Sequence, residues 1–209
     1  MRIDKEQLYQ ADRKWRLNLV NSLSGIKPAN LIGTRSKAGL NNLAIFSSVV
    51  HLGSNPAQLG FVLRPQGEVP RHTFENILET GFYTINHIQE EWIRKAHYTS
   101  AKLDREESEF ERMQIEKEFI EDFHAPFVKE SPVKIGMKFN AEIALPNGCS
   151  FIVGDVLSVI FPDEALNDLG QLDLVKIEGV GISGLNSYYS LEKLNTFPYV
   201  RTHEIPDFK

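Results

Sequence analysis

A short basic segment, Pro70-Arg71-His72-Thr73, offers the groups that a phosphorylated ligand needs. Arg71, His72 and Thr73 place a guanidinium, an imidazole and a hydroxyl at the predicted start of a helix. Helix N-terminal amides and charge-assisted donors both bind phosphate. Arg64 adds a second guanidinium at the end of the preceding predicted strand. In the alternative interpretation Thr73 only caps its helix and the arginines are solvated, and these residues alone do not decide between the two.

Small polar residues precede that segment and indicate where a flat ring would lie. Asn42, Ala44, Ser47 and Ser48 fall on or just after one predicted strand. Small side chains let a ring approach the backbone, and strand-end amides can bond its polar edge. The alternative is an edge strand whose polar residues face water.

A third polar cluster, His97, Thr99 and Ser100, follows a predicted helix. It either lines the same pocket or places His97 at the negative end of the helix dipole, and we favour the second interpretation. The sequence lacks a GxSxG elbow and a GxxxxGK[ST] phosphate loop, and the glycines of residues 179–184 lack the long following helix of a dinucleotide fingerprint. Without its own nucleophile or acid–base pair, the chain can still be an enzyme if a cofactor supplies the chemistry.

Short strands dominate the predicted elements around these residues. Asn147-Gly148 between alternating runs predicts a hairpin, and the scarcity of long helices favours an antiparallel barrel over a parallel sheet. The acidic stretch 101–121 is expected to form solvated loops and short helices. Thr73 and Gly81 are the expected N-cap and C-terminal stop of one helix. The expected helices are 4–20, 73–80 and 90–98, and the expected strands are 30–34, 42–50, 58–64, 82–88, 138–145, 150–161 and 172–182.

Composition excludes several classes of function. The 209 residues carry a net charge of −5, which argues against a general nucleic-acid binder. No window approaches a membrane span, and the charged N-terminus does not read as a signal peptide. A single cysteine and the absence of an HExxH pair leave metal binding unsupported. We expect a cytoplasmic protein without membrane or nucleic-acid partners.

The order of the motifs resembles the flavin reductase-like family, the FMN-binding split-barrel proteins that include flavoredoxin. Each motif is loose, and their common order over about residues 28–200 carries the resemblance. In chain order they are Thr34 with the G-x-x-N-x-A-x-x-S stretch from Gly39 to Ser47, a turn ending in Pro56, Arg64-Pro65, Arg71-x-Thr73 with Asn76-Ile77, Gly81 to Asn86, HYTSA with Ser108-Glu109-Phe110, and GLNSYYSL.

The resemblance implies a mainly β fold, a six-stranded antiparallel FMN-binding split barrel with a Greek-key arrangement and added helices. It divides the chain into an N-terminal helical extension (1–27), the split-barrel domain (28–200) and a C-terminal tail (201–209). It further implies a homodimer that binds FMN non-covalently near the dimer interface, with FAD less favoured.

The resemblance also assigns residues to the cofactor. Asn42, Ala44, Ser47 and Ser48 should border the isoalloxazine ring and ribityl chain, and Arg71, His72 and Thr73 should hold the phosphate. Ile45 and Ser48 depart from the family pattern, which leaves the shape of the pocket above the ring open. The expected cofactor-binding residues are Thr34, Asn42, Ala44, Ser47, Ser48, Val49, Arg64, Arg71, His72, Thr73, His97, Thr99 and Ser100.

The function implied is an FMN-dependent oxidoreductase that passes electrons from NAD(P)H through FMN to an unidentified acceptor. Hydride transfer to the flavin needs no acid–base side chain, so no catalytic residue is expected. The rival hypothesis is a non-catalytic flavoprotein, an electron carrier or flavin-binding module. A third is a split barrel whose pocket holds haem or pyridoxal phosphate.

Overall fold

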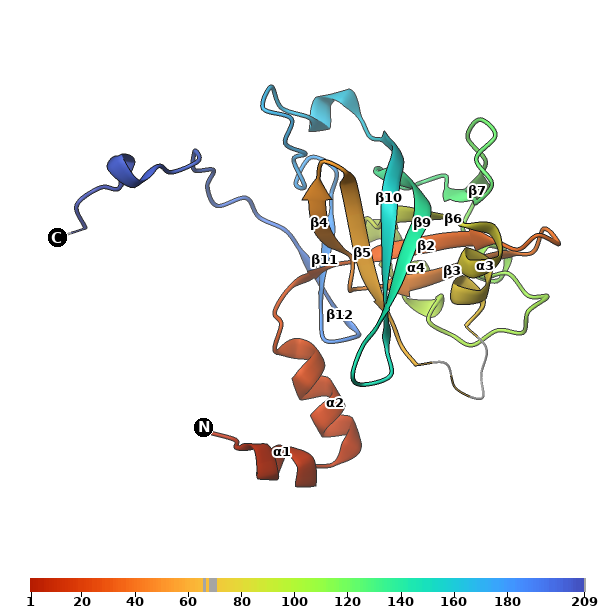
Figure 1. Cartoon of the computed structure of the whole chain (residues 1–209), viewed down its shortest axis with the longest axis horizontal. Coiled ribbons are helices and arrows are strands. Elements are labelled where there is room, and N and C mark those ends of the chain that lie inside the picture. Colours follow the sequence, from red (N-terminus) through yellow and green to blue (C-terminus); the bar gives the residue numbers. More distant parts are fainter. Residues whose placement is uncertain (66, 68–70, 209) are drawn as a thin grey trace.

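Seven antiparallel strands form the main sheet, in the order β3-β2-β6-β9-β10-β5-β4. The computed structural model describes residues 1–65, 67 and 71–208, so Pro70 of the basic segment lies outside the described residues. Figure 1 shows β4, β5 and β10 running in a different direction from β2, β3 and β6. The mainly β fold with helices is therefore confirmed, with seven strands in the main sheet where the resemblance implied six.

Strand β2 (Asn30–Arg35) joins the two cores of the molecule because it is buried on both faces. Successive strand side chains point to opposite faces. Ile32 packs into a cluster with Phe61 and Ile85, whereas Leu31 packs into a second cluster with Leu43. The second cluster also contains Trp92, Ala96 and Phe110 from the helical segments that cover that side of the sheet.

Two hairpins, β9–β10 and β4–β5, form the half of the main sheet that ends in the edge strand β4. The predicted Asn147-Gly148 turn is confirmed between β9 (Lys134–Ala144) and β10 (Ser150–Ile160), and Gly148 takes a φ of 78° that favours glycine. The predicted strand 42–50 was too long. The chain instead ends β3 (Asn41–Phe46) at Phe46 and begins a separate edge strand, β4 (Val50–Ser54), at Val50.

Helix α3 (His72–Thr80) ends as predicted, at Gly81 in the left-handed conformation. Its start differs, because Arg71 occupies the N-cap position and no side chain caps the helix. The hydroxyl of Thr73 turns inward instead and accepts a hydrogen bond from Asn42 Nδ2 at 2.9 Å. The predicted N-cap role of Thr73 was wrong.

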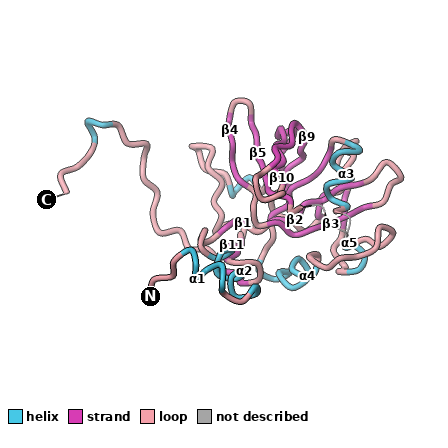
Figure 2. Tube along the Cα trace, turned by 60° about the horizontal axis from the view of Figure 1, so that its bottom comes forward, coloured by secondary structure: helices cyan, strands magenta, loops and turns pink. Residues whose placement is uncertain are grey.

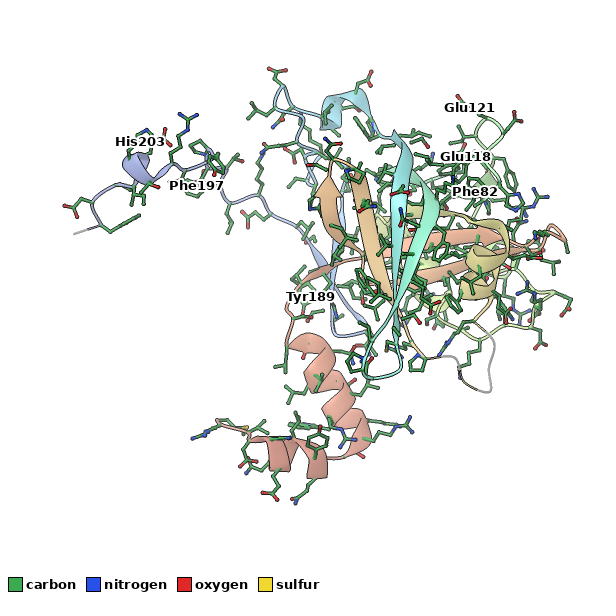
Figure 3. The ribbon with its side chains drawn as sticks, viewed as in Figure 1. Phe82, Glu118, Glu121, Tyr189, Phe197 and His203 are labelled. Carbon is green, nitrogen blue, oxygen red and sulfur yellow. The ribbon has the colours of Figure 1, made fainter. Side chains whose placement is uncertain are left out.

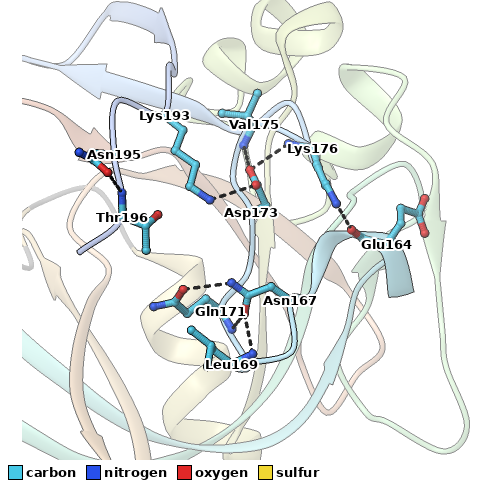
Figure 4. Close-up of polar contacts among 10 residues, drawn as sticks. All are labelled: Glu164, Asn167, Leu169, Gln171, Asp173, Val175, Lys176, Lys193, Asn195 and Thr196. Atoms are coloured by element: carbon cyan, nitrogen blue, oxygen red, sulfur yellow. Dashed lines mark hydrogen bonds and ion pairs between the residues drawn. The ribbon is translucent and has the colours of Figure 1, made fainter. Parts of the chain in front are cut away.

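Three other predicted segments differ from the structure. The single helix 4–20 is two helices, because the Asp12 carboxylate accepts the amides of Lys14 and Trp15 and starts a second helix. Residues 101–121 are not wholly solvated, since Glu109 and Phe110 are buried. The strand 172–182 is confined to Val180–Ser183, preceded by a turn that Asp173 organises through its carboxylate (Figure 4).

A smaller sheet, β1-β11-β12, joins the two ends of the chain. The chain then leaves the body as an extended C-terminal segment, which Figures 1 and 2 both show standing apart. Among the described residues, no helix is long and apolar enough to cross a membrane. The helices and remaining strands are α1 (Lys5–Gln10), α2 (Arg13–Ser22), the 3-10 helix η1 (Glu90–Trp92), α4 (Ile93–Tyr98), α5 (Glu109–Arg112), η2 (Asp163–Ala165), η3 (Thr202–Glu204), β1 (Lys27–Pro28), β5 (Ala57–Leu63), β6 (Phe82–His87), β7 (Lys117–Glu118), β8 (Phe127–Val128), β11 (Val180–Ser183) and β12 (Ser187–Ser190).

Candidate functional site

A pocket of about 860 Å³ opens where the main sheet meets the helices. Its walls come from β3 and the loop after it, the end of β5, the start of α3, and the segment that follows α4. The C-terminal end of α2, together with β1 and the β11–β12 turn, adds a rim from the chain termini. Segments far apart in the sequence therefore meet at this one hollow.

Twelve of the thirteen residues expected to bind the cofactor line this pocket. They come from four separate segments, whose order the sequence gives but whose proximity in space it does not. The twelve are Asn42, Ala44, Ser47, Ser48, Val49, Arg64, Arg71, His72, Thr73, His97, Thr99 and Ser100.

Thr34 is the exception, because it lies outside the lining of the pocket. It is fully buried, and its hydroxyl accepts a hydrogen bond from Asn76 Nδ2 at 3.1 Å. Arg105 Nη2 in turn donates to Asn76 Oδ1 at 3.0 Å. Thr34 therefore ties β2 to α3 instead of facing the pocket.

Arg71, at the start of α3, lines the pocket and carries an unsatisfied cationic donor. Arg71 Nε is buried and has no hydrogen-bond partner among the described residues. A buried donor without an acceptor costs about 1–3 kcal/mol, and more when it is charged. Arg64 and His72 lie on the same lining. This end of the pocket is suited to an anionic group with several acceptor oxygens.

The serine and asparagine side chains expected to contact a ring are partly used within the protein. Ser48 Oγ accepts the Val62 amide at 3.0 Å and lies 3.2 Å from the Val62 carbonyl oxygen, to which it donates. Asn42 Nδ2 is bonded to Thr73. These side chains fix the loop after β3 and join β3 to α3, which leaves the contacts with a ring to backbone groups, Ala44 and Ser47.

Glu109 is a pocket residue whose burial the sequence did not reveal. Its Oε2 accepts the Leu43 amide at 2.9 Å, so it holds β3 in place from the start of α5. Burial raises the pKa of the Glu109 carboxyl, while the hydrogen bond from Leu43 opposes the shift. The acidic surroundings of Glu109 in the sequence pointed to solvent, and only the motif Ser108-Glu109-Phe110 marked it.

His97, another residue of the wall, is paired with a tyrosine. His97 Nδ1 lies 2.9 Å from the Tyr188 hydroxyl, and the two rings meet edge to face at 5.7 Å. Burial raises the pKa of Tyr188 to about 12, so its hydroxyl stays protonated at neutral pH. Thr99 Oγ1 donates to the Ala96 carbonyl at 2.7 Å, which supports the expected helix-ending role of this cluster. His97 and Thr99 nevertheless line the pocket as well.

The rim carries Lys27, which the sequence did not single out. Lys27 Nζ donates to the Asn21 carbonyl at 2.8 Å and to the Gly184 carbonyl at 3.1 Å, tying α2 to the β11–β12 turn. Burial lowers the pKa of Lys27. With Lys102, Arg64 and Arg71, the described lining has four Lys or Arg side chains and one carboxylate, in a chain whose net charge is −5. The described lining of the pocket therefore favours an anion, although the protein as a whole is acidic.

Within the described ranges, no group of three or more His, Cys, Asp or Glu side chains is placed to hold a metal ion. The donors that line the pocket are guanidinium, ammonium, imidazole, hydroxyl and amide groups. Such a set binds phosphate and carbonyl oxygens.

Comparison with known proteins gives a consistent result. The family model for the flavin reductase like domain matches residues 26–175. A split-barrel chain from Shewanella frigidimarina NCIMB 400, a candidate flavin reductase, is 46% identical and superposes with a TM-score of 0.92, covering 96% of this chain and 100% of that chain.

More distant structures share the fold. Flavoredoxin of Desulfovibrio vulgaris (Miyazaki F) is 21% identical with a TM-score of 0.74, over 95% of this chain and 98% of that one. An FMN-binding protein from Thermus thermophilus is 14% identical with a TM-score of 0.69, over 85% of this chain and 93% of that one. At these identities the likeness concerns the fold alone.

Proposed function

Because this chain belongs to the flavin reductase-like family, as its match over residues 26–175 shows, we propose that it binds FMN in the 860 Å³ pocket and uses it as an NAD(P)H-dependent oxidoreductase. A flavin-related role follows from the family. The choice of FMN, the nicotinamide donor and the position of the cofactor are our proposal.

The observation that carries the proposal is the buried Arg71 Nε, which lacks a partner among the described residues. A phosphate oxygen would satisfy it, and Arg71 stands at the start of a helix, where backbone amides favour phosphate. Arg64 and His72 lie on the same lining. A terminal phosphate, as in FMN, therefore fits this end better than an uncharged group.

The other walls fit a flat ring. Ala44 and Ser47 are small, and the backbone after β3 is held by the bonds of Ser48 to Val62. The amide of Leu43 is already taken by Glu109, so this carboxylate fixes the strand that the ring would lie against. A wall fixed before the ligand arrives loses less entropy when it binds.

Bound FMN would supply the electron-transfer chemistry, accepting electrons from a reduced nicotinamide and releasing them to an acceptor. The task of the protein is to orient the ring and to favour negative charge. Lys27 and Lys102 on the lining contribute positive potential. The neutral Tyr188 hydroxyl fixes the His97 ring at the wall. No side chain of the chain is assigned a proton-transfer step.

We also propose a homodimer, as the resemblance in the sequence implies. The pocket rim includes the C-terminal end of α2, a helix that has no buried residue of its own. A second copy would give such a helix a surface to pack against.

Anaerobic mixing with NADH and with NADPH tests the activity. Rapid bleaching of the bound flavin by either nucleotide is expected, followed by recovery of colour when an electron acceptor is added. If dithionite bleaches the flavin and neither nucleotide does, the protein is an electron carrier or flavin-binding module and the proposed activity is wrong.

A further inference from the structure

The last residues of the chain expose several large apolar side chains. We define the C-terminal arm as residues 191–208. Phe197 is 76% exposed and Tyr199 is 89% exposed, and Leu194, Ile205 and Phe208 are also exposed. Figure 3 shows Phe197 and His203 well away from the sheets. An extended run of this composition has an unfavourable solvation free energy in water.

A hollow that such an arm could fill lies between α2 and β12. We call it the α2–β12 groove; it has a volume of about 440 Å³. Trp15 and Leu19 line it from the helix, and Tyr189 lines it from the strand. The rest of its lining is polar or glycine: Asn18, Ser22, Ser183, Gly184, Asn186 and Ser187. A cavity of about 150 Å³ holds a benzene ring, so the groove has room for two aromatic side chains. Trp15 is 46% exposed in the open groove.

Helix α2 needs such a contact for its own stability. It spans ten residues, and none of them is buried. Isolated helices of this length are marginal in water, because tertiary packing of an apolar face supplies most helical stability. The bonds of Lys27 to Asn21 and Gly184 hold only its C-terminal end. A partner segment in the groove would cover Trp15 and hold the rest of the helix.

We propose that the C-terminal arm of one copy docks into the α2–β12 groove of a second copy, and that the two copies exchange arms. The groove is lined partly by the turn at the N-terminal end of β12, whereas the arm leaves from the C-terminal end of that strand. Lys193 Nζ lies 3.4 Å from Asp173 Oδ2 and holds the start of the arm against the loop 163–178 (Figure 4). The arm then runs outward in both overall views.

Size and symmetry favour a second copy as the occupant. A two-fold dimer uses the same patch twice, so each copy gives one arm and receives one. Two aromatic rings in the groove, each burying about 150–250 Å², would supply about half of the roughly 800 Å² that each partner buries in a standard interface. The Shewanella chain matches 96% of this chain, and the unmatched 4% is fewer residues than the arm contains. The similarity therefore includes part of the arm.

Charge favours the same occupant. The arm has three acidic and two basic residues, and residues 1–22 have five basic and three acidic residues. The arm and residues 1–22, which include the groove helix α2, therefore differ in the sign of their net charge. The arm lacks the excess of Lys and Arg that an anionic membrane surface would attract.

Sedimentation velocity of the full chain and of a chain ending at Ser190 tests the proposal. The full chain is expected to sediment as a dimer of twice 23.8 kDa. Removal of the arm should weaken dimerisation by at least about tenfold, because buried aromatic side chains dominate interface energies. Leu194→Ser/Phe197→Ser/Tyr199→Ser in the full-length chain should do the same, and it remains informative if the shortened chain fails to fold. Leu169→Ser removes an equally exposed leucine (80%) elsewhere and should change nothing.

Tryptophan fluorescence locates the contact. The chain has two tryptophans, and Trp92 is buried at 7% exposure. Iodide should therefore quench Trp15 in the triple variant and spare it in the concentrated full-length chain. Shielding that does not change on dilution into the monomer range would show that the arm folds back on its own copy and would overturn the proposal. A monomeric full-length chain, or an unchanged dimer without the arm, would also overturn it.

Discussion

Replacement of Arg71 by alanine tests the phosphate end of the pocket. The side chain lines the pocket, and its buried Nε has no acceptor among the described residues. One charge-assisted hydrogen bond contributes about 1.5–3 kcal/mol. Loss of that bond should weaken FMN binding by roughly tenfold to a hundredfold.

Riboflavin makes the measurement specific, because it carries the same ring and ribityl chain without the phosphate. Fluorescence titration of the apoprotein with both ligands is the assay. Arg71→Ala should reduce the affinity for FMN and leave that for riboflavin nearly unchanged. Arg94→Ala is the matched control, since Arg94 is exposed on α4 and lies outside the pocket lining.

Two results would refute this reasoning. Unchanged FMN affinity in folded Arg71→Ala protein would remove Arg71 from the phosphate site. An equal loss for FMN and riboflavin would mean that the substitution deforms the pocket and that no phosphate contact was lost.

Three further predictions concern buried groups. Burial lowers the pKa of His87 from 6.5 to about 4, so its contribution to stability is present above pH 6.5 and is lost as pH falls towards 4; it amounts to about 3 kcal/mol. Urea unfolding of His87→Leu protein should show a flatter pH dependence in that window, and an unchanged slope would contradict the assignment. Burial raises the pKa of Glu109 above 4.5, so ionisation of this carboxyl destabilises the folded state as pH rises. Glu109→Gln keeps an acceptor for the Leu43 amide and should be at least as stable as wild type at pH 7 in thermal melts. Lower stability of the variant would be evidence against this. A methyl group at Gly154 would overlap the Tyr83 hydroxyl, so Gly154→Ala should lower the free energy of unfolding by about 1–3 kcal/mol. Tyr83→Phe removes that buried hydroxyl, which has no partner in the described structure, and should restore part of the lost stability. Additive effects in the double variant would disprove this contact.

The sequence could predict the parts of the fold that depend on local chemistry. Gly81 ends α3, and Asn147-Gly148 forms the turn between β9 and β10, because each position requires the left-handed backbone conformation that glycine adopts readily. The order of motifs predicted the family, and the structure brings twelve of the thirteen expected site residues to one pocket. Whether those residues bind a flavin stays a prediction.

The sequence could not predict features that depend on contacts between distant segments. Thr73 has the chemistry of an N-cap, yet its hydroxyl accepts from Asn42, thirty-one residues away in the chain. Glu109 lies in an acidic stretch that reads as solvated, and only the position of Leu43 shows why it is buried. Lys27 lines the pocket, and Tyr188 bonds to His97 of the pocket wall, from the two ends of the chain. Local propensity carries no information on such pairs.

The absorption spectrum of the purified protein, followed by extraction and mass measurement of its cofactor, tests the central claim most directly. Flavin absorbance and about one FMN per chain are expected, either as purified or after addition of FMN to the apoprotein. A colourless protein that does not take up added FMN would contradict it.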